Sequence, residues 1–135
     1  MKLTGLILTY NCENLVQKAI NKIPKNILYE VICIDDESKD NTRKVIEKNN
    51  ISFFTHKHTG YGGNLFEGLK IAFKRGATHV VEIHGDGQYD LSKITDVYKI
   101  LKASQSFREA FYLAVLGCLK PALCSKSVLC GMSFL

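Results

Sequence analysis

The chain has 135 residues, and its 46% hydrophobic and 23% charged content excludes a disordered or fibrous protein and suits one globular domain. Its 18 basic and 13 acidic residues give a formal charge of +5. Because the basic residues are scattered rather than clustered, we expect no nucleic-acid partner, and the mild positive charge suits an anionic small molecule or an anionic lipid surface.

The first third of the chain predicts two strands joined by a helix. An apolar run at residues 2–9 predicts a strand that ends before the turn former Asn11. Apolar residues at helical spacing over residues 16–23 predict a helix, which Pro24 stops. A second apolar run at residues 29–34 predicts the next strand.

An acidic turn, a helix and a third strand follow. Residues 35–42 are too polar for a strand, and either Asp40 or Asn41 is expected to cap a helix that runs to residue 50. A short strand is predicted at residues 51–54. The loop at residues 55–63 contains three glycines and leads into the next helix.

The third helix is expected to end at Gly76, and the residues predicted to share its apolar face are Leu65, Leu69, Ala72 and Phe73. Residues 79–83 predict a fourth strand. After the polar segment that follows it, Ser92 is expected to cap a helix that continues to Leu101.

Four strands alternating with four helices predict an α/β fold, a parallel sheet of about four strands flanked by helices. In such sheets ligands bind in the crevice outside the carboxyl ends of the strands. Polar clusters follow every predicted strand, at residues 10–11, 35–36, 56–63 and 84–88. We therefore expect one functional site at this edge, with Asp36 and Asp86 lining the same crevice.

Several kinds of site are excluded by the sequence motifs. The turn after the first strand has no G-x-G-x-x-G, and no G-x-x-x-x-G-K-[ST] occurs, which removes a dinucleotide cradle and a P-loop. The odd number of cysteines, without a CxxC pair, predicts neither a zinc site nor a disulfide framework. Polar residues follow the first apolar run too soon for a secretory signal, so we expect a cytoplasmic protein.

The remaining chemistry is that of paired carboxylates. Asp86 lies between two glycines, where it suits Mg²⁺ or Mn²⁺ completed by phosphate oxygens. Asp35 and Asp36 suit hydrogen bonds from base and ribose donors, and Tyr10 offers a flat face for a base. Structural explanations also stand for these residues: an acidic turn, an Asx-turn at Asp86, and a core histidine at His84.

These segments, in this order, resemble family 2 glycosyltransferases. The residues that carry the resemblance are Tyr10-Asn11, the segment VICIDDESKDNT at 31–42, GYGGN at 60–64, GATHVV at 76–81 and HGDGQYD at 84–90. The resemblance covers about residues 2–103 and is nearest to dolichyl-phosphate mannose synthase and related polyprenyl-phosphate sugar transferases. It implies a GT-A (Rossmann-like) fold and transfer of a sugar from a nucleoside-diphosphate sugar with inversion.

The resemblance also implies roles for single residues. Tyr10 and Asp36 correspond to contacts with the nucleoside of a UDP- or GDP-linked sugar, and Asp86 corresponds to the ligand of Mg²⁺ or Mn²⁺. His84 stands where many members have the first carboxylate of an Asp-x-Asp, so His84 and Gln88 are further candidate metal ligands. The residues that complete the expected nucleotide-sugar site are Asn11, Asp35, Gly62 and Gly63.

The chain changes character near residue 104, so we predict a nucleotide-sugar-binding GT-A half-domain at 1–103 and an atypical apolar tail at 104–135, helical or poorly ordered. Residues 111–119 are apolar but too few to span a bilayer, which takes about 20 residues. The tail fits a buried terminal helix, a membrane-surface association segment, or a segment unrelated to the family fold after a truncation or a change of reading frame.

Two functions follow from this division. The first is a glycosyltransferase acting on a polyprenyl phosphate or a glycan, at the inner face of the membrane. The alternative is a truncated, non-catalytic chain that binds a nucleotide sugar or associates through its tail, because the acceptor half and its general base are missing. A nucleotidyltransferase is a weaker third hypothesis, since its basic glycine-rich loop after the first strand is absent.

Overall fold

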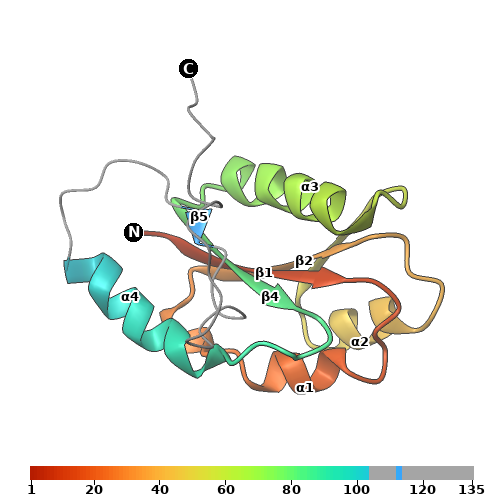
Figure 1. The fold of residues 1–135 in the computed structure, drawn as a ribbon, viewed down its shortest axis with the longest axis horizontal. Coiled ribbons are helices and arrows are strands. Elements are labelled where there is room, and N and C mark those ends of the chain that lie inside the picture. The colour runs from red at the N-terminus through yellow and green to blue at the C-terminus, as the bar shows by residue number, and fades with distance from the viewer. Residues whose placement is uncertain (104–111, 114–135) are drawn as a thin grey trace, which may run out of the picture.

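The computed structural model describes residues 1–103 and 112–113, and its centre is a parallel sheet in the order β3-β2-β1-β4-β5 (Figure 1). The strands are β1 Leu3–Thr9, β2 Glu30–Asp35, β3 Ser52–Thr55, β4 His79–His84 and β5 Tyr112–Leu113. The predicted α/β class and the four predicted strands are therefore present. The two-residue β5, paired with β4, lies in the segment for which no strand was predicted.

Helices connect the strands and cover both faces of the sheet. They are α1 Val16–Asn21, α2 Thr42–Lys48, α3 Gly60–Lys74 and α4 Ile94–Ala103, with short 3-10 turns η1 Lys25–Ile27 and η2 Leu91–Lys93. Figure 1 shows α3 on one face of the sheet and α1 and α2 on the other. The predicted tail falls outside the described residues apart from β5.

The core follows the alternation of side chains along each strand. In β1, Leu3 and Ile7 pack toward α1 and α2, while Leu6 and Leu8 pack toward α3. All seven residues of β1 are buried, as expected for the central strand of a sheet covered on both faces.

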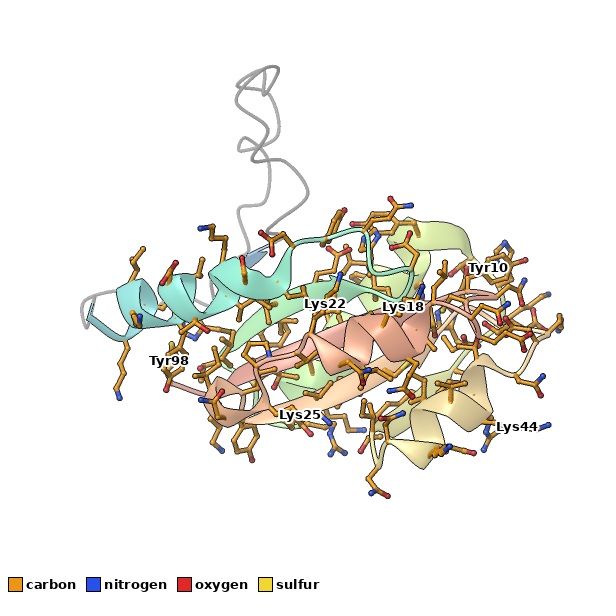
Figure 2. All side chains as sticks on the ribbon, turned by 90° about the horizontal axis from the view of Figure 1, so that it is seen from below. Tyr10, Lys18, Lys22, Lys25, Lys44 and Tyr98 are labelled. Carbon is orange, nitrogen blue, oxygen red and sulfur yellow. The ribbon has the colours of Figure 1, made fainter. Side chains whose placement is uncertain are left out.

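Helix α1 shows how a short amphipathic helix covers one of these faces. Its buried residues, Val16, Ala19 and Ile20, face the sheet. Lys18 and Lys22 lie on the opposite, exposed side (Figure 2). This division gives the helix an apolar stripe toward the core and a charged stripe toward solvent.

Helix α3 packs on the sheet through smaller residues than the sequence predicted. Its buried positions are Asn64, Gly68 and Ala72, four residues apart, whereas Phe73 is 38% exposed. A Cβ at Gly68 would lie 2.7 Å from Cγ2 of Ile34, so glycine allows the close approach. The prediction that Phe73 shares the packed face was wrong, because the side of the helix that packs most closely on the sheet is the one with the small side chains.

The caps of the later helices also differ in detail from the predictions. Asp90, not Ser92, caps η2, because its carboxylate accepts a hydrogen bond from the backbone N–H of Ser92 at 2.9 Å. Hydrogen bonds from Ser92 also hold the pKa of Asp90 below its ordinary value. At α2, Asn41 is the N-cap by position, but the carboxylate of Asp40 accepts from Thr42 N at 3.0 Å.

The strand order positions a ligand site. The chain runs from β1 outward to β2 and β3, and then returns to the other side of β1 to form β4. The order therefore reverses between β1 and β4, the place where open α/β sheets bind ligands. No helix in the described part of the chain is long and apolar enough to cross a membrane.

Candidate functional site

A cleft of about 260 Å³ opens at the carboxyl edge of the sheet, where the strand order reverses. The ends of β1 and β4 form part of its wall through Tyr10 and His84. The start of α3 contributes Gly60 and Tyr61, and His58 lies on the loop before α3.

The cleft brings together four of the residues singled out in the sequence and leaves the others outside its lining. Tyr10, Asp36, His84 and Asp86 line it, so the two aspartates share one crevice. The remaining candidates, which are absent from the lining, are Asn11, Asp35, Gly62, Gly63 and Gln88.

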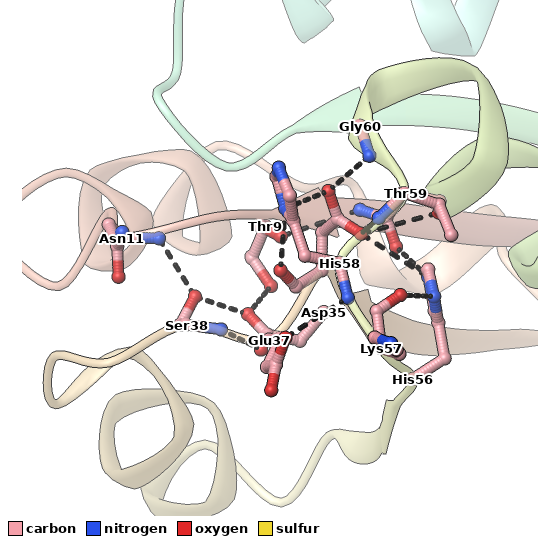
Figure 3. Close-up of polar contacts among 12 residues, drawn as sticks. Thr9, Asn11, Asp35, Glu37, Ser38, His56, Lys57, His58, Thr59 and Gly60 are labelled. Carbon is pink, nitrogen blue, oxygen red and sulfur yellow. Dashed lines mark hydrogen bonds and ion pairs between the residues drawn. The ribbon is translucent and has the colours of Figure 1, made fainter.

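Asp36 joins the end of β2 to the start of α3. Figure 3 shows the loop that it holds, with His58, Thr59 and Gly60 labelled. The carboxylate of Asp36 is almost fully buried and accepts hydrogen bonds from the backbone N–H groups of Thr59 and Gly60, both at 2.8 Å. Nδ1 of His58 lies 2.8 Å from Oδ2 of the same carboxylate, and Nε2 of His56 lies 3.8 Å from Oδ1. Asp36 therefore holds the loop that forms one wall of the cleft.

Asp35 points away from the cleft, because neighbouring side chains of a strand alternate. Its carboxylate accepts from the hydroxyl of Thr9 at 2.8 Å and from the hydroxyl of Ser38 at 2.6 Å. The backbone N–H of Ser38 also donates to it, at 2.7 Å. Asp35 thus ties the ends of β1 and β2 together and shapes the turn after β2.

Asn11 extends this connection between the two loops. It adopts a positive φ of 45°, its backbone N–H donates to Oγ of Ser38 at 2.8 Å, and its side-chain oxygen accepts from Lys39 N at 2.8 Å. These bonds turn the amide toward the β2 loop, so Asn11 positions that loop beside the cleft.

Asp40 is a second connection between the same loops. Its carboxylate accepts from the Thr42 hydroxyl at 2.6 Å and from the backbone N–H of Glu13 at 3.0 Å. Burial acts to raise the pKa of Asp40, but the hydrogen bonds from Thr42 and Glu13 outweigh it and hold that pKa below its ordinary value. In return, Glu13 Oε2 accepts from the backbone N–H of Asn41 at 2.6 Å.

An aromatic pair flanks the cleft. The ring of Tyr10 is half exposed and lies 4.7 Å from that of His58, with 31° between the ring planes. One end of the pair comes from the β1 loop and the other from the loop that Asp36 holds. The pair holds the half-exposed ring of Tyr10 beside the cleft, and a base can stack on such a ring.

The predicted glycine loop is the first turn of α3. Gly62 and Gly63 lie within the helix, which begins at Gly60. A Cβ on Gly62 would meet nothing within 4 Å, whereas one on Gly63 would lie 2.2 Å from Oγ1 of Thr59. The N-terminus of this 15-residue helix lies at the cleft, and the anion that such a terminus favours is there the carboxylate of Asp36, which accepts from Gly60 N at 2.8 Å.

The turn after β4 brings Asp86 to the cleft. A Cβ on Gly85 would lie 2.8 Å from the carbonyl oxygen of Leu8, so only glycine allows this turn to pack against β1. Gly87 has a positive φ of 70° and completes the turn. Asp86 Oδ1 accepts from the backbone N–H of Gln88 at 3.0 Å, which is the predicted Asx-turn.

A buried network beneath the cleft was missed by the sequence analysis. Glu82, in the middle of β4, is 3% exposed. Its carboxylate accepts from the Tyr61 hydroxyl at 3.0 Å, and Nε2 of His84 lies 2.6 Å away. The signal was a single charged residue within an apolar strand, since a buried charge needs partners.

Cys12 is a further lining residue. Burial raises the pKa of its thiol to about 11, so the thiol is protonated at neutral pH. Cys12 is 7% exposed and packs in the core cluster beneath α1, so it is a packing residue in the wall of the cleft.

The described residues of the cleft supply only part of the coordination shell that a divalent cation needs. No group of three His, Cys, Asp or Glu side chains converges on one point within residues 1–103 and 112–113. Asp86 offers Oδ2, which no other described residue hydrogen-bonds, and the imidazole of His84 is a second donor. Such a partial set fits a hard cation whose shell is completed by phosphate oxygens and water.

The family model for glycosyl transferase family 2 matches residues 6–106, which include every residue that lines the cleft.

Curated relatives agree with this match. An uncharacterized glycosyltransferase, MG060, from Mycoplasma genitalium is 44% identical over 75 residues, which are 48% of this chain and 25% of that protein. The UDP-N-acetylglucosamine--dolichyl-phosphate N-acetylglucosaminyltransferase of Methanococcus voltae is 31% identical over 115 residues, 69% of this chain and 46% of that protein. The matched segments thus span less than half of these relatives.

Among solved structures, S. aureus TarS (residues 1–349) has the same fold, with a TM-score of 0.56 and 23% sequence identity. The match covers 76% of this chain and 33% of that one. The sheet and helices described above are therefore those of a GT-A fold.

Proposed function

Since this chain belongs to glycosyl transferase family 2, we propose that its cleft binds a nucleoside-diphosphate sugar for an inverting sugar transfer. The observation that carries the proposal is the single cleft shared by Asp36 and Asp86 at the point where the strand order reverses. One such molecule then reaches from an aromatic surface at Tyr10 to a carboxylate at Asp86.

The nucleoside is proposed to lie at the end of the cleft formed by Tyr10 and Asp36. The exposed ring of Tyr10, held beside His58, suits stacking on a base. Asp36 lines this end of the cleft and shapes it, because its carboxylate holds Thr59 N, Gly60 N and the ring of His58.

The diphosphate is proposed to lie between the start of α3 and the turn after β4. Asp86 would hold Mg²⁺ or Mn²⁺ there, with His84 as a second ligand, and phosphate oxygens would complete the coordination shell. A divalent cation there supplies positive charge to the departing diphosphate. Gln88 supports Asp86 through its backbone N–H.

We propose a polyprenyl phosphate as the acceptor, with a glycan as the other class. The relative from Methanococcus voltae is named for transfer to dolichyl phosphate. A phosphate acceptor is already anionic, so its attacking oxygen needs less help from a general base. Such a reaction would take place at the cytoplasmic face of a membrane, where this acceptor lies.

Donor binding tests the proposal directly. UDP-N-acetylglucosamine, UDP-glucose and GDP-mannose are titrated with Mn²⁺ into the wild-type chain, Asp86→Asn and the control Asp96→Asn. Asp96 is exposed on α4, and among the described residues its carboxylate pairs with Lys99 alone, at 3.7 Å. Asp96→Asn should therefore bind the donor as wild type does. We expect one donor to bind, and Asp86→Asn to weaken it about tenfold or more. Equal binding by all three chains, or none by any, would contradict the proposal.

Transfer activity separates an active enzyme from a chain that only binds its donor. The purified chain is incubated with the bound sugar nucleotide, Mn²⁺ and a short polyprenyl phosphate. Labelled sugar on the lipid supports an enzyme, and binding without transfer supports the non-catalytic alternative.

A further inference from the structure

The carboxylate of Glu82 is buried directly beneath the cleft and reaches it through other side chains only. Glu82 is 3% exposed and does not line the cleft, whereas its partners Tyr61 and His84 both do. Tyr61 comes from the first turn of α3, and His84 from the end of β4. Glu82 therefore joins the two walls between which we placed the diphosphate.

Three contacts fix the ring of His84. Its Nε2 lies 2.6 Å from Oε1 of Glu82, and its ring centroid lies 4.1 Å from that of Tyr89 and 5.5 Å from that of Tyr61. A ring held from three sides has little freedom to rotate, so its second nitrogen has a defined direction.

The carboxylate also decides which nitrogen of the ring carries the proton. A carboxylate accepts hydrogen bonds, so we assign Nε2 as the donor in the contact with Glu82. In a neutral imidazole Nδ1 then keeps its lone pair, and no other described residue hydrogen-bonds Nδ1. A carboxylate that holds one nitrogen while the other is left for a cation is the usual second-shell arrangement at metal sites.

We infer that Glu82 is a positioning residue that presents Nδ1 of His84 as a nitrogen ligand and so gives the cleft a preference for Mn²⁺ over Mg²⁺. This inference rests on the proposed function, because it assumes a cation beside Asp86. Nitrogen donors are tolerated by Mn²⁺, whereas Mg²⁺ strongly prefers oxygen. The preference would thus come from a residue that touches neither the cation nor the sugar nucleotide.

Calorimetric titrations test the inference. Mn²⁺ and Mg²⁺ are titrated in the presence of UDP or GDP into the wild-type chain, Glu82→Gln and the control Glu67→Gln. Glu67 is on α3 and pairs only with the exposed Lys70 among the described residues, so it gives a matched loss of charge away from the cleft. We expect Glu82→Gln to weaken Mn²⁺ binding about tenfold and to change Mg²⁺ binding much less.

A second variant covers the case in which Glu82→Gln does not fold, which circular dichroism would show. His84→Asn offers an oxygen in place of the ring nitrogen and leaves Glu82 intact. The ratio of Mn²⁺ to Mg²⁺ affinity should fall in this variant. An unchanged ratio in whichever variant folds would overturn the inference.

Nitrogen-15 spectra of the histidine rings give a readout besides binding constants, first without metal or nucleotide and then with both. At pH 8 without metal, the ring of His84 should carry its proton on Nε2, and Mn²⁺ added with nucleotide should broaden this ring first. A proton on Nδ1 would overturn the inference. If the wild-type chain and Glu82→Gln bind Mn²⁺ equally well in the presence of nucleotide, only the inference about Glu82 fails. If the wild-type chain binds neither Mn²⁺ nor the nucleotide, the proposed function fails as well.

Discussion

Asp36→Asn is the substitution for which the structure predicts the clearest change in stability. The carboxylate of Asp36 accepts from Thr59 N and Gly60 N at 2.8 Å each and lies 2.8 Å from Nδ1 of His58. An amide at this position keeps one acceptor oxygen but turns an NH₂ group toward a donor. One buried donor therefore loses its partner, and the remaining bonds are no longer assisted by charge.

The expected magnitude follows from these lost interactions. A hydrogen bond to a charged group is worth about 1.5–3 kcal/mol, and an unsatisfied buried donor costs about 1–3 kcal/mol. Because these terms overlap, we expect Asp36→Asn to lower the free energy of unfolding by about 2–4 kcal/mol. With a urea m-value of about 2 kcal/mol/M, the unfolding midpoint falls by about 1–2 M.

Urea unfolding followed by circular dichroism measures this loss, with Asp96→Asn as the matched control. Asp96 is exposed and makes only a 3.7 Å contact with Lys99 among the described residues, so the control should stay within about 0.5 kcal/mol of wild type. Hydrogen exchange adds a local measurement, since the amides of Thr59 and Gly60 should exchange faster in Asp36→Asn alone. A midpoint within 0.5 M of wild type and unchanged exchange would refute this account of Asp36.

Three further predictions concern pH, packing and thiol reactivity. The pKa of Asp40 is held below its ordinary value of about 4, so the contribution of Asp40 to stability is complete above that value. This contribution is lost as the pH falls through the folded-state pKa. The difference in unfolding free energy between wild type and Asp40→Asn should therefore stay constant from about pH 6 to 8 and shrink below about pH 4. Gly68→Ala should destabilise the fold by about 1–3 kcal/mol in thermal unfolding, because the new Cβ would lie 2.7 Å from a core methyl. Gly62→Ala is the control: its Cβ would meet nothing within 4 Å, so this variant should be neutral or more stable by up to about 1 kcal/mol. Burial raises the pKa of Cys12 to about 11, so iodoacetamide at pH 8 should label this thiol at least roughly tenfold more slowly in the folded chain than in urea. Peptide mass spectrometry measures the two labelling rates, and equal rates would contradict the burial of Cys12.

Asp35 and Asp36 have different roles in the structure, and the sequence did not predict this difference. In the sequence the two carboxylates form one acidic pair suited to a ligand. In the fold Asp35 bonds to Thr9 and Ser38, while Asp36 faces the loop before α3 and the cleft. Adjacent strand residues point to opposite sides, but the last residue of a strand and the first of a turn cannot be assigned to a side without knowing where the strand ends.

Glu82 and the first turn of α3 show the same limit. Apolar periodicity predicted β4 and α3, and both are present. Which residues of α3 pack on the sheet depends on how closely the helix approaches it, and Gly68 sets that approach. His84 is two residues along the same strand as Glu82, on the same face, but the other partner, Tyr61, comes from α3, so no local pattern could have named Tyr61.

By itself, the sequence of this protein determined the order of its strands and helices, the parallel sheet and the edge at which its polar residues gather. Those properties follow from hydrophobic periodicity and turn residues, which act between neighbours in the chain. The tertiary structure alone decided that Asp35 bonds to Thr9 and Ser38 rather than lining the cleft, and that Glu82 lies beneath it in contact with Tyr61. The contacts with Thr9 and Tyr61 join residues far apart in the chain, and they form only when several elements pack together around one core.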